Sequence, residues 1–348
     1  MRRQASSLDL VTVRHPIPGR YSKYIKTISK IVRVNLVTGS IVRTPQLGND
    51  FRTVMAFLNL LAKSLFIRGP ILLDVVAAVS VYYKEQKDII IDFRTPYPVE
   101  LMALGHERLA ILAKRIENKI RNTQMAFAAN DRMAKYCTEI GVENVVVIPN
   151  YPWRNFLPTV EGSKWKILNT LPMEEKIVLF TGSVRLREIY GLDLLLAAWK
   201  YVEEASGSTL IILGNVPIRY ISMKMDSFGI KKIRLPGRVP TNDVANWINA
   251  SNVCVAPRTP GFPKSFYDDK DSTKISEYAA LRKPIVAAGY APSRQYHLVD
   301  QDPQDLAEGI LHAIEGKTRL PQPHYWEENE PKIWGALIEY LKQTNIME

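Results

Sequence analysis

One short stretch holds the residue types best suited to chemistry. Ser272 or Thr273 can cap a predicted helix in which Lys274 and Glu277 lie one turn apart, and Asp269 stands in the loop before it. The N terminus of a helix offers unpaired N–H groups and a positive dipole end, so it binds anions, and Lys274 adds a full charge there. A carboxylate such as Glu277 accepts hydrogen bonds from two neighbouring hydroxyls, as a ribose presents them. The stretch therefore suits a sugar nucleotide, with Asp269 available for hydroxyls of a sugar beyond the phosphates.

The surrounding pattern predicts a strand, a loop, a helix and a second strand. The apolar run NVCVAP ends in proline, RTPGFPKSFYDDKD is rich in turn formers, and residues 275, 278, 279 and 281 are apolar at helical spacing before PIVAA. Open α/β sheets bind ligands at loops that leave the carboxyl end of a strand and enter a helix. We therefore expect this loop and the helix start to form part of a binding site.

The segment DDKDSTKISEYAALRKPIVAA resembles the E-x7-E region of the retaining GT-B glycosyltransferases of family 4, whose members often read K-x-x-E-Y-x-A-x-x-K-P-x-V. The match is close from Lys274 to Val286, and Asp269 stands where the family usually has glutamate. The resemblance spans about residues 170–315 with specific motifs and the first half in outline. It implies that Glu277 holds the ribose and Asp269 the hexose of a nucleotide diphosphate sugar.

A second phosphate-binding loop is expected after the strand predicted at residues 176–180. Gly182 permits close backbone approach to a diphosphate, Ser183 follows it, and Arg185 and Arg187 can neutralise its charge. The family commonly has an arginine and a lysine here, the lysine just before a glycine. This chain has Tyr190 at that position, so Arg185 or Arg187 is expected to replace the lysine. Two solvated loop arginines are the alternative.

Further strand ends supply the remaining candidates. Gly214 and the turn at Arg238 end strands in the second half, where backbone groups can contact a nucleobase. In the first half, Gly19 and Arg20 follow the first predicted strand and resemble the glycine-bearing loop that GT-B enzymes place near donor and acceptor, with a simple turn as the alternative. Arg94 stands just past the strand DIIIDF, where it can contact an anionic acceptor or a donor phosphate.

Composition bounds the class of protein. The 348 residues suffice for two domains, and 46% hydrophobic with 23% charged residues is typical of a soluble globular protein. Cys137 and Cys254 are expected to be reduced core thiols. No signal peptide is visible, and the apolar run 70–83 is shorter than the roughly 20 residues that span a bilayer. These observations predict a cytoplasmic protein.

The net charge of +11 favours anionic partners. Because no nucleic-acid-binding motif accompanies this charge, we expect no nucleic acid partner. A solvated basic surface is one explanation, and peripheral association with the anionic inner face of a membrane is the other. The helix predicted at residues 51–66 is apolar on more than one face, which burial explains and lipid contact would also explain.

Several motifs are missing from the chain. No G-x-G-x-x-G follows a strand, and there is no P-loop, H-E-x-x-H, C-x-x-C or D-x-D run with an evident metal role. This argues against a nicotinamide enzyme, an NTPase and a zinc enzyme. The resemblance implies that basic groups and a helix dipole, with no metal and no cofactor, offset the charge of the leaving diphosphate.

Strands and helices alternate in both halves, which predicts an α/β protein with two doubly wound, Rossmann-like domains facing a cleft. The resemblance implies that this is the GT-B fold. Residues 1–150 form the acceptor-side domain, 151–325 the nucleotide-sugar-binding domain, and 326–348 a helix that packs back on the first domain. The predicted function is retaining transfer of a sugar from a nucleotide diphosphate sugar to a glycan or lipid-linked acceptor. A nucleotide-sugar epimerase or hydrolase of the same fold, or a non-catalytic sugar-nucleotide-binding member, are the alternatives.

Overall fold

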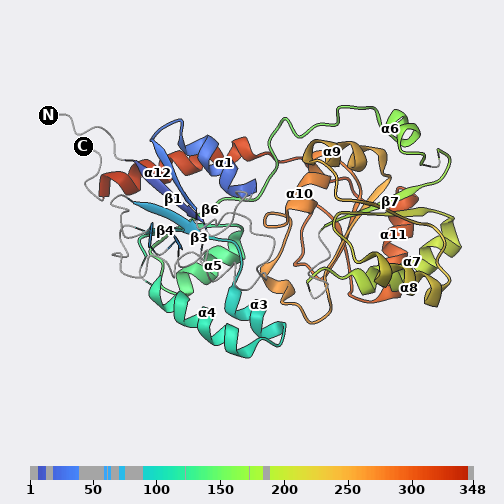
Figure 1. The fold of residues 1–348 in the computed structure, drawn as a ribbon, viewed down its shortest axis with the longest axis horizontal. Coiled ribbons are helices and arrows are strands. Elements are labelled where there is room, and N and C mark those ends of the chain that lie inside the picture. The colour runs from blue at the N-terminus through green and yellow to red at the C-terminus, as the bar shows by residue number, and fades with distance from the viewer. Residues whose placement is uncertain are drawn as a thin grey trace. The chain divides into compact units, whose positions relative to one another are not determined.

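A computed structural model describes residues 7–12, 19–38, 59–60, 62–63, 70–74, 89–121, 123–171, 173–182 and 189–343. The chain divides into two compact units (Figure 1). The first unit combines Met1–Pro149 with Glu328–Glu348, and the second is Asn150–Glu327. Each unit is built on one six-stranded sheet whose neighbouring strands are all parallel.

The sheet of the first unit has the order β2-β1-β3-β4-β5-β6. Its strands are β1 (Leu8–Thr12), β2 (Val34–Thr38), β3 (Ile71–Asp74), β4 (Ile89–Phe93), β5 (Met125–Ala128) and β6 (Asn144–Val147). The described helices are α1 (Gly19–Ile28), α3 (Tyr97–Ala103), α4 (Glu107–Lys119), α5 (Asp131–Glu139) and α12 (Glu330–Gln343). Every residue of β4 and β5 is buried, as parallel strands covered on both faces require.

The sheet of the second unit has the order β12-β11-β10-β7-β8-β9. Its strands are β7 (Ile177–Thr181), β8 (Thr209–Leu213), β9 (Ile233–Gly237), β10 (Val253–Pro257), β11 (Ile285–Ala288) and β12 (His297–Val299). The helices are α6 (Gly162–Leu168), α7 (Leu192–Ser206), α8 (Ile218–Phe228), α9 (Thr241–Ala250), α10 (Thr273–Ala280) and α11 (Pro303–Ile314), with 3-10 turns η4 (Lys264–Phe266) and η5 (Trp326–Asn329).

The core of the second unit explains this layering. Leucines and Trp199 of α7 pack with Leu306 and Ile310 of α11 against one face of β7, β8, β10 and β11. Helices α9 and α10 lie on the other side of the sheet (Figure 1). Burial of both sheet faces leaves the strand ends as the place where loops can form a site.

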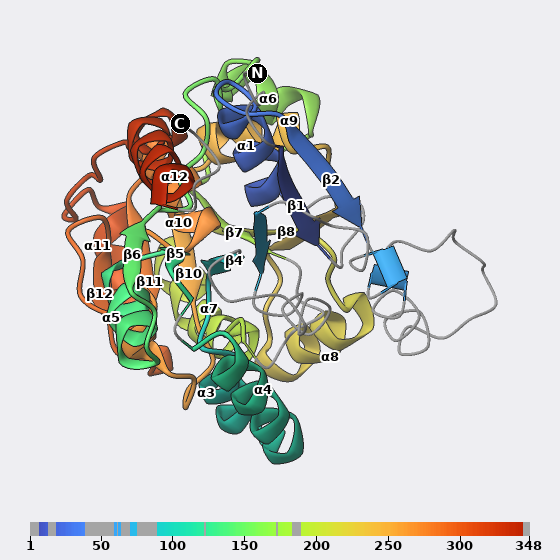
Figure 2. The same ribbon diagram turned by 90° about the vertical axis from the view of Figure 1, so that its left-hand side faces the viewer.

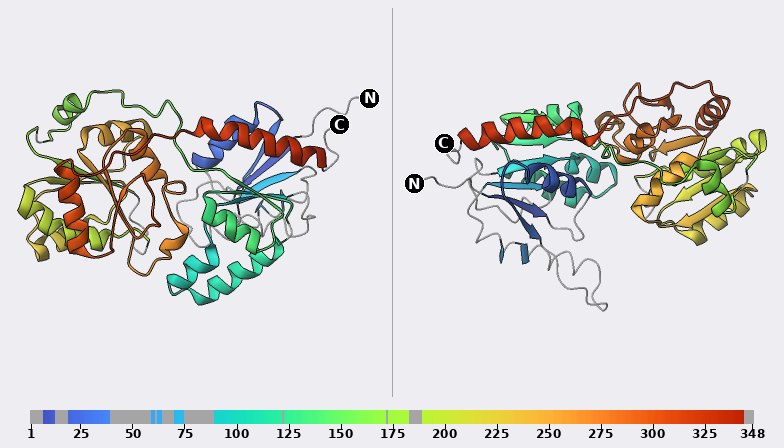
Figure 3. Two further views of the ribbon diagram at one scale, coloured as in Figure 1. Left: turned by 180° about the vertical axis from the view of Figure 1, so that it is seen from behind. Right: turned by 90° about the horizontal axis from the view of Figure 1, so that it is seen from above.

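The last helix, α12, packs on the first unit beside α1 (Figure 3). The Trp334 indole donates to the backbone carbonyl of Thr27 at 3.0 Å, and the Lys30 ammonium lies 2.7 Å from the Glu330 carboxylate. Ile333, Leu337 and Tyr340 of α12 are buried. Two segments that are far apart in sequence thus form one core.

The sheets confirm the prediction of an α/β protein with two doubly wound halves. Both cysteines are buried free thiols, as predicted. One local difference concerns Gly19, which was expected in a loop but is the first residue of α1. The helix predicted at residues 51–66 lies largely outside the described residues. None of the described helices is both long and apolar enough to cross a membrane.

Candidate functional site

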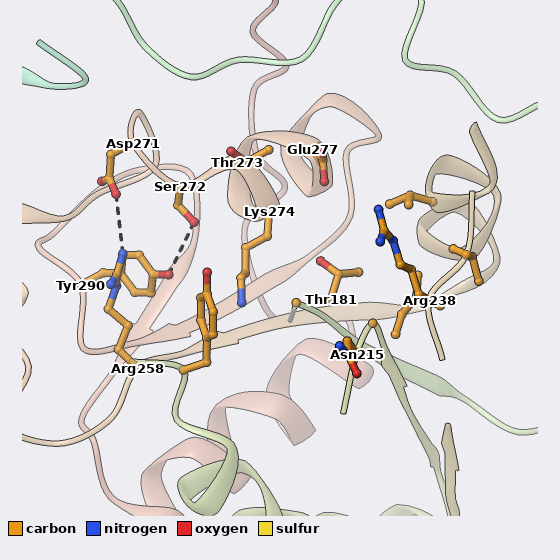
Figure 4. Close-up of a pocket in the computed structure, with 16 residues that line it drawn as sticks. Thr181, Asn215, Arg238, Arg258, Asp271, Ser272, Thr273, Lys274, Glu277 and Tyr290 are labelled. Atoms are coloured by element: carbon orange, nitrogen blue, oxygen red, sulfur yellow. Dashed lines mark hydrogen bonds and ion pairs between the residues drawn. The ribbon is translucent and has the colours of Figure 1, made fainter. Parts of the chain in front are cut away.

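A pocket of about 690 Å³ lies in the second unit at the carboxyl ends of β10, β7, β8 and β9 (Figure 4). Sheet order reverses at β7, which pairs with β10 on one side and β8 on the other, and such a switch point is where open α/β sheets bind ligands. The lining residues are Thr181, Gly182, Tyr190, Leu213, Gly214, Asn215, Arg238, Val239, Val244, Arg258, Asp271, Ser272, Thr273, Lys274, Glu277 and Tyr290.

Lys274 brings a buried positive charge to this pocket. Its Nζ has no hydrogen-bond partner among the described residues and lies 4.2 Å from the ring centroids of both Phe180 and Tyr190. Burial lowers the pKa of Lys274 to about 7, the Arg258 charge lowers it too, and Glu277 acts in the opposite direction. An ammonium taken out of water without a hydrogen-bonding partner is costly, so the group is suited to an incoming anion.

Two glycines keep the floor of the pocket beside Lys274 free of side chains. Gly214 has φ +138°, and a Cβ there would lie 2.0 Å from the carbonyl oxygen of Gly182. A Cβ on Gly182 would lie 3.2 Å from Lys274 Nζ. Only glycine fits position 214, because both its backbone angle and its neighbour exclude a side chain.

The N terminus of α10 opens into the same pocket. Ser272 occupies the N-cap position, as predicted, but its side chain makes no capping hydrogen bond. Its hydroxyl lies 3.5 Å from the Tyr290 hydroxyl, and the Thr273 hydroxyl accepts from the Asn150 amide at 2.5 Å. Neither hydroxyl is used to cap the first turn, so N–H groups of that turn are left to meet an anion.

Tyr278 fixes α10 against the end of β7. Its hydroxyl accepts from the Thr181 backbone N–H at 2.8 Å and lies 2.8 Å from the Thr181 hydroxyl. The side chain is completely buried, and burial raises the pKa of Tyr278 well above its ordinary value, so the phenol stays neutral. This contact sets the distance between Lys274 and the Gly182 turn.

The predicted donor residues fall into three groups. Gly182, Gly214, Arg238, Ser272, Thr273, Lys274 and Glu277 line one pocket. Glu277 is half-buried on α10, one turn beyond Lys274, and Arg238 is exposed at the end of β9. Ser183, Arg185 and Arg187 lie outside the described residues.

Asp269 forms a third case. It is not among the described residues that line the pocket, and its carboxylate accepts from the Ser293 hydroxyl while its backbone carbonyl accepts from Ser276 at 2.8 Å. The pocket carboxylate from this loop is Asp271 instead. In the described part of the chain, no three His, Cys, Asp or Glu side chains are grouped so that they could hold a metal ion.

Arg258 is a pocket residue that the sequence prediction omitted. It is buried directly after β10, its guanidinium carbon lies 3.8 Å from the Tyr267 ring centroid and 4.6 Å from that of Tyr290, and Nη2 lies 3.6 Å from the Asp271 carboxylate. Figure 4 shows Arg258, Asp271 and Tyr290 on one side of Lys274 and Arg238 on the other. Arg258 stands just past the end of a strand, which is the same signal that identified Arg94, so the sequence could have identified Arg258 as well.

Two of the three predicted acceptor-side residues, Arg20 and Arg94, meet in the first unit around one carboxylate. Arg20 is buried with Nε 2.9 Å from Asp92, and Arg94, which is 24% exposed, has Nε 3.3 Å from the same carboxylate. Arg94 also lies over the Tyr21 ring. Arg20 thus positions Asp92, and Arg94 is the more accessible cation. A Cβ on Gly19 would meet nothing within 4 Å, so no close approach requires glycine there.

Comparison with known proteins finds a matching family model for part of the chain and solved structures with a similar fold. Residues 175–316 match the family model described as Glycosyl transferases group 1. Sucrose-phosphate synthase from Thermosynechococcus elongatus is 15% identical over 97% of this chain and 100% of that chain, with a TM-score of 0.72. Anabaena HepE in complex with UDP-glucose is 14% identical over 89% and 90% of the two chains, with a TM-score of 0.64.

A putative UDP-N-acetylglucosamine 2-epimerase from Listeria monocytogenes is 9% identical over 97% of each chain, with a TM-score of 0.65. No curated protein matches the chain by sequence. Since these identities are low, the structural likeness carries the fold alone. The family match covers every residue of the described pocket. Residues 175–316 thus match the glycosyl transferases group 1, the chain has the GT-B fold, and the two together support a glycosyltransferase.

Proposed function

We propose that this glycosyltransferase moves a sugar, with retention of configuration, from a nucleotide diphosphate sugar to a glycan or lipid-linked acceptor. Lys274 carries the proposal: its ammonium is buried in a pocket, has no hydrogen-bond partner among the described residues, and lies beside Gly182 and the start of α10. A diphosphate is the anion that such a charge and helix terminus suit. A pocket of about 690 Å³ also has the volume for a nucleotide, since small-ligand pockets span roughly 300–1,000 Å³.

The position of Lys274 indicates where each part of the donor is proposed to bind. The diphosphate lies against Gly182, Lys274 and the α10 N terminus, Glu277 accepts the ribose hydroxyls, and the base lies toward Gly214 and Arg238. HepE has been solved with UDP and with UDP-glucose, which favours a uridine donor for a protein of the same fold. Ser183 with Arg185 or Arg187 adds further groups to the diphosphate in this proposal.

The proposed reaction breaks the bond between the anomeric carbon and the diphosphate oxygen. A hydroxyl oxygen of the acceptor forms the new bond on the same face of the sugar, and its proton passes to the departing phosphate oxygen. Lys274, the α10 N terminus and the loop arginines stabilise the charge that develops on the leaving diphosphate, with no metal ion or cofactor.

The hexose is proposed to lie at the loop before α10. Asp269 was predicted as its contact, but Asp269 is held by Ser293, and Asp271 is the loop carboxylate that lines the pocket. Asp271 is itself bound, by the Asp268 backbone N–H and by Arg258, so the choice between the two rests on the pocket lining: we propose Asp271 for the sugar hydroxyls and a positioning role for Asp269.

The acceptor is proposed to bind the first unit, where Arg94 is placed to meet an anionic group while Arg20 holds Asp92. The excess of positive charge, +11 over the chain, suits an acceptor attached to anionic lipid. We place the protein in the cytoplasm, at the inner face of a membrane, with no nucleic acid partner.

The test is a thermal-shift panel of nucleotide diphosphates and their sugars without added metal, on the wild type and Glu277→Ala. A ligand at a hundredfold excess over its dissociation constant adds about 2.7 kcal/mol to the stability of the native state, which such a scan resolves. We expect one nucleotide family to shift the wild type and not Glu277→Ala. Glu308→Ala on the exposed side of α11 is the matched control and should respond like the wild type. No shift with any nucleotide would contradict the proposed donor.

An epimerase or hydrolase of nucleotide sugars is the second candidate, because the Listeria epimerase has the same fold. Such an enzyme converts its substrate with no acceptor present. Product analysis of the donor incubated alone separates the two: an unchanged donor supports transfer, and conversion to an epimer or free sugar supports the alternative. Nucleotide binding with no conversion under either condition would identify a non-catalytic member of the fold.

A further inference from the structure

Helix α4 of the first unit exposes an unusual set of apolar side chains. Leu109, Ile111 and Leu112 are 52%, 54% and 53% exposed, and Met102 at the end of α3 is 53% exposed. Figure 2 shows α3 and α4 running together at the lower edge of this unit. Single exposed apolar residues are common on protein surfaces, but here four large ones lie within eleven residues of sequence, on two helices that contact each other.

Basic residues share the same side of the helix. Arg108 and Arg115 are exposed. Arg108 lies four residues before Leu112 and Arg115 three residues after it, so the three form one row along the helix, with Ile111 beside it. We call Arg108, Ile111, Leu112 and Arg115 the outer face of α4, and Leu109 flanks it one turn before Leu112. The sequence of α4 contains four basic residues and only two carboxylates, Glu107 and Glu117.

The opposite side of α4 is fixed to the unit. Ala110 and Glu117 are buried, and the Glu117 carboxylate accepts from the Tyr136 hydroxyl of α5 at 2.8 Å and lies 3.4 Å from Lys114. Burial raises the pKa of Glu117, and the Tyr136 hydrogen bond opposes this. One of the two carboxylates thus points inward, and the other, Glu107, is exposed at the start of the helix, one turn before Ile111.

We infer that the outer face of α4 binds the surface of an anionic lipid bilayer. Leucine and isoleucine side chains enter the boundary between headgroups and acyl chains, and flanking arginines pair with lipid phosphates. Charge complementarity selects this occupant, because the patch is basic in a chain of net charge +11. The inference names the surface for the proposed lipid-linked acceptor, and binding can be measured without donor or acceptor.

The experiment is flotation of the full chain with phosphatidylcholine vesicles, with and without a third of phosphatidylglycerol, at low salt. Variants are Arg108→Gln/Arg115→Gln and Ile111→Asn/Leu112→Asn. Ile218→Asn/Met223→Asn on α8, whose two side chains are 61% and 56% exposed, is the matched control for loss of surface apolar groups. Each basic residue near an anionic surface contributes about 1 kcal/mol, which is about fivefold in affinity, so the arginine pair should weaken binding on the order of 25-fold.

Support requires that the wild type and the α8 variant float with anionic vesicles only and that both α4 variants are lost from the vesicle fraction. All variants should keep the wild-type thermal transition, since exposed substitutions usually change stability by under about 0.5 kcal/mol. Absence of wild-type binding, equal binding to neutral vesicles, or α4 variants that still float would overturn the inference. The inference would also be overturned if the wild type is a dimer, the α4 variants are monomers, and flotation does not change. These outcomes do not change nucleotide binding, so the flotation experiment tests the inference and the thermal-shift panel tests the proposed function independently.

Discussion

The burial of Lys274 affects both the pH dependence of stability and the binding of an anion. Because its pKa in the folded protein is lowered to about 7, the folded state binds fewer protons than the unfolded state between pH 7 and the ordinary lysine value of about 10.5. The buried ammonium therefore costs stability in full below pH 7, and the cost disappears as the pH rises through this window. An anion bound beside the ammonium removes the cost by another route.

We expect Lys274→Met to raise the free energy of unfolding at pH 6 and to reduce the rise in stability between pH 7 and 10 by the contribution of Lys274. A depression of one pKa unit corresponds to about 1.4 kcal/mol, so the difference should reach a few kcal/mol. Urea unfolding at a series of pH values measures it. Lys283, whose pKa burial also lowers, is present in both proteins and cancels. Parallel pH profiles for the two proteins would contradict the assignment.

Asp271 and Asp269 provide a matched pair for locating the hexose. Asp271→Asn should weaken binding of the nucleotide sugar on the order of tenfold while leaving the nucleotide diphosphate unchanged, because a carboxylate-to-hydroxyl hydrogen bond contributes about 1.5–3 kcal/mol. Asp269→Asn should affect stability more than discrimination, since its carboxylate accepts from Ser293 inside the protein. Calorimetric titration with both ligands tests this. The opposite result would return the sugar contact to Asp269.

Helix α10 organises the pocket, and the Tyr278 hydroxyl attaches it to β7. A phenylalanine at this position removes that hydroxyl and keeps the ring, so no large cavity forms. Tyr278→Phe leaves the Thr181 backbone N–H buried without its acceptor, which costs about 1–3 kcal/mol. We expect that loss in urea unfolding, together with weaker nucleotide binding because Lys274 is displaced from Gly182. Tyr201→Phe, at an exposed position of α7, should change neither. An unchanged nucleotide affinity in Tyr278→Phe would show that α10 is held by other contacts.

The N terminus of α10 is also the basis for a prediction about metals. If this terminus, Lys274 and the loop arginines offset the charge of the leaving diphosphate, turnover should persist in excess EDTA. Activity is measured before and after chelation, with Mg²⁺ and Mn²⁺ added back as the control. Loss of activity on chelation and its recovery with either ion would contradict metal-independent transfer.

The sequence was informative where spacing fixes an element and less so in the loops between elements. Apolar runs placed β10 and β11 correctly and helical spacing placed α10, and Lys274 and Glu277 were identified because helical spacing fixes both relative to the helix start. The loop at residues 258–272 has no such period. Its fold depends on the packing of Arg258 with Tyr267 and Tyr290 and on the pairing with Asp271, contacts that no local pattern encodes. Asp271, which lines the pocket, was accordingly not predicted, and the sugar contact of Asp269 stays a prediction.

At the scale of the whole molecule, the two units have separate sheets and separate cores. Every described residue of the donor pocket belongs to the second unit. We therefore expect calorimetry to resolve two unfolding transitions and a nucleotide diphosphate to raise only the transition of residues 150–327. Glu277→Ala should remove that shift and leave the other transition unchanged. A single transition that moves as one would show that the units unfold together.

The order in which the ribosome delivers this chain differs from the order in which its units can be completed. Residues 150–327 emerge as one continuous segment and can fold as soon as Glu327 is clear, whereas the first unit lacks α12 until the final stretch has been translated. Until then the surface of α1 that receives Trp334 and Glu330 has no cover. The first unit is thus synthesised first but completed last. In nascent chains stalled before residue 330, the uncovered surface of α1 should be accessible to proteases and chaperones.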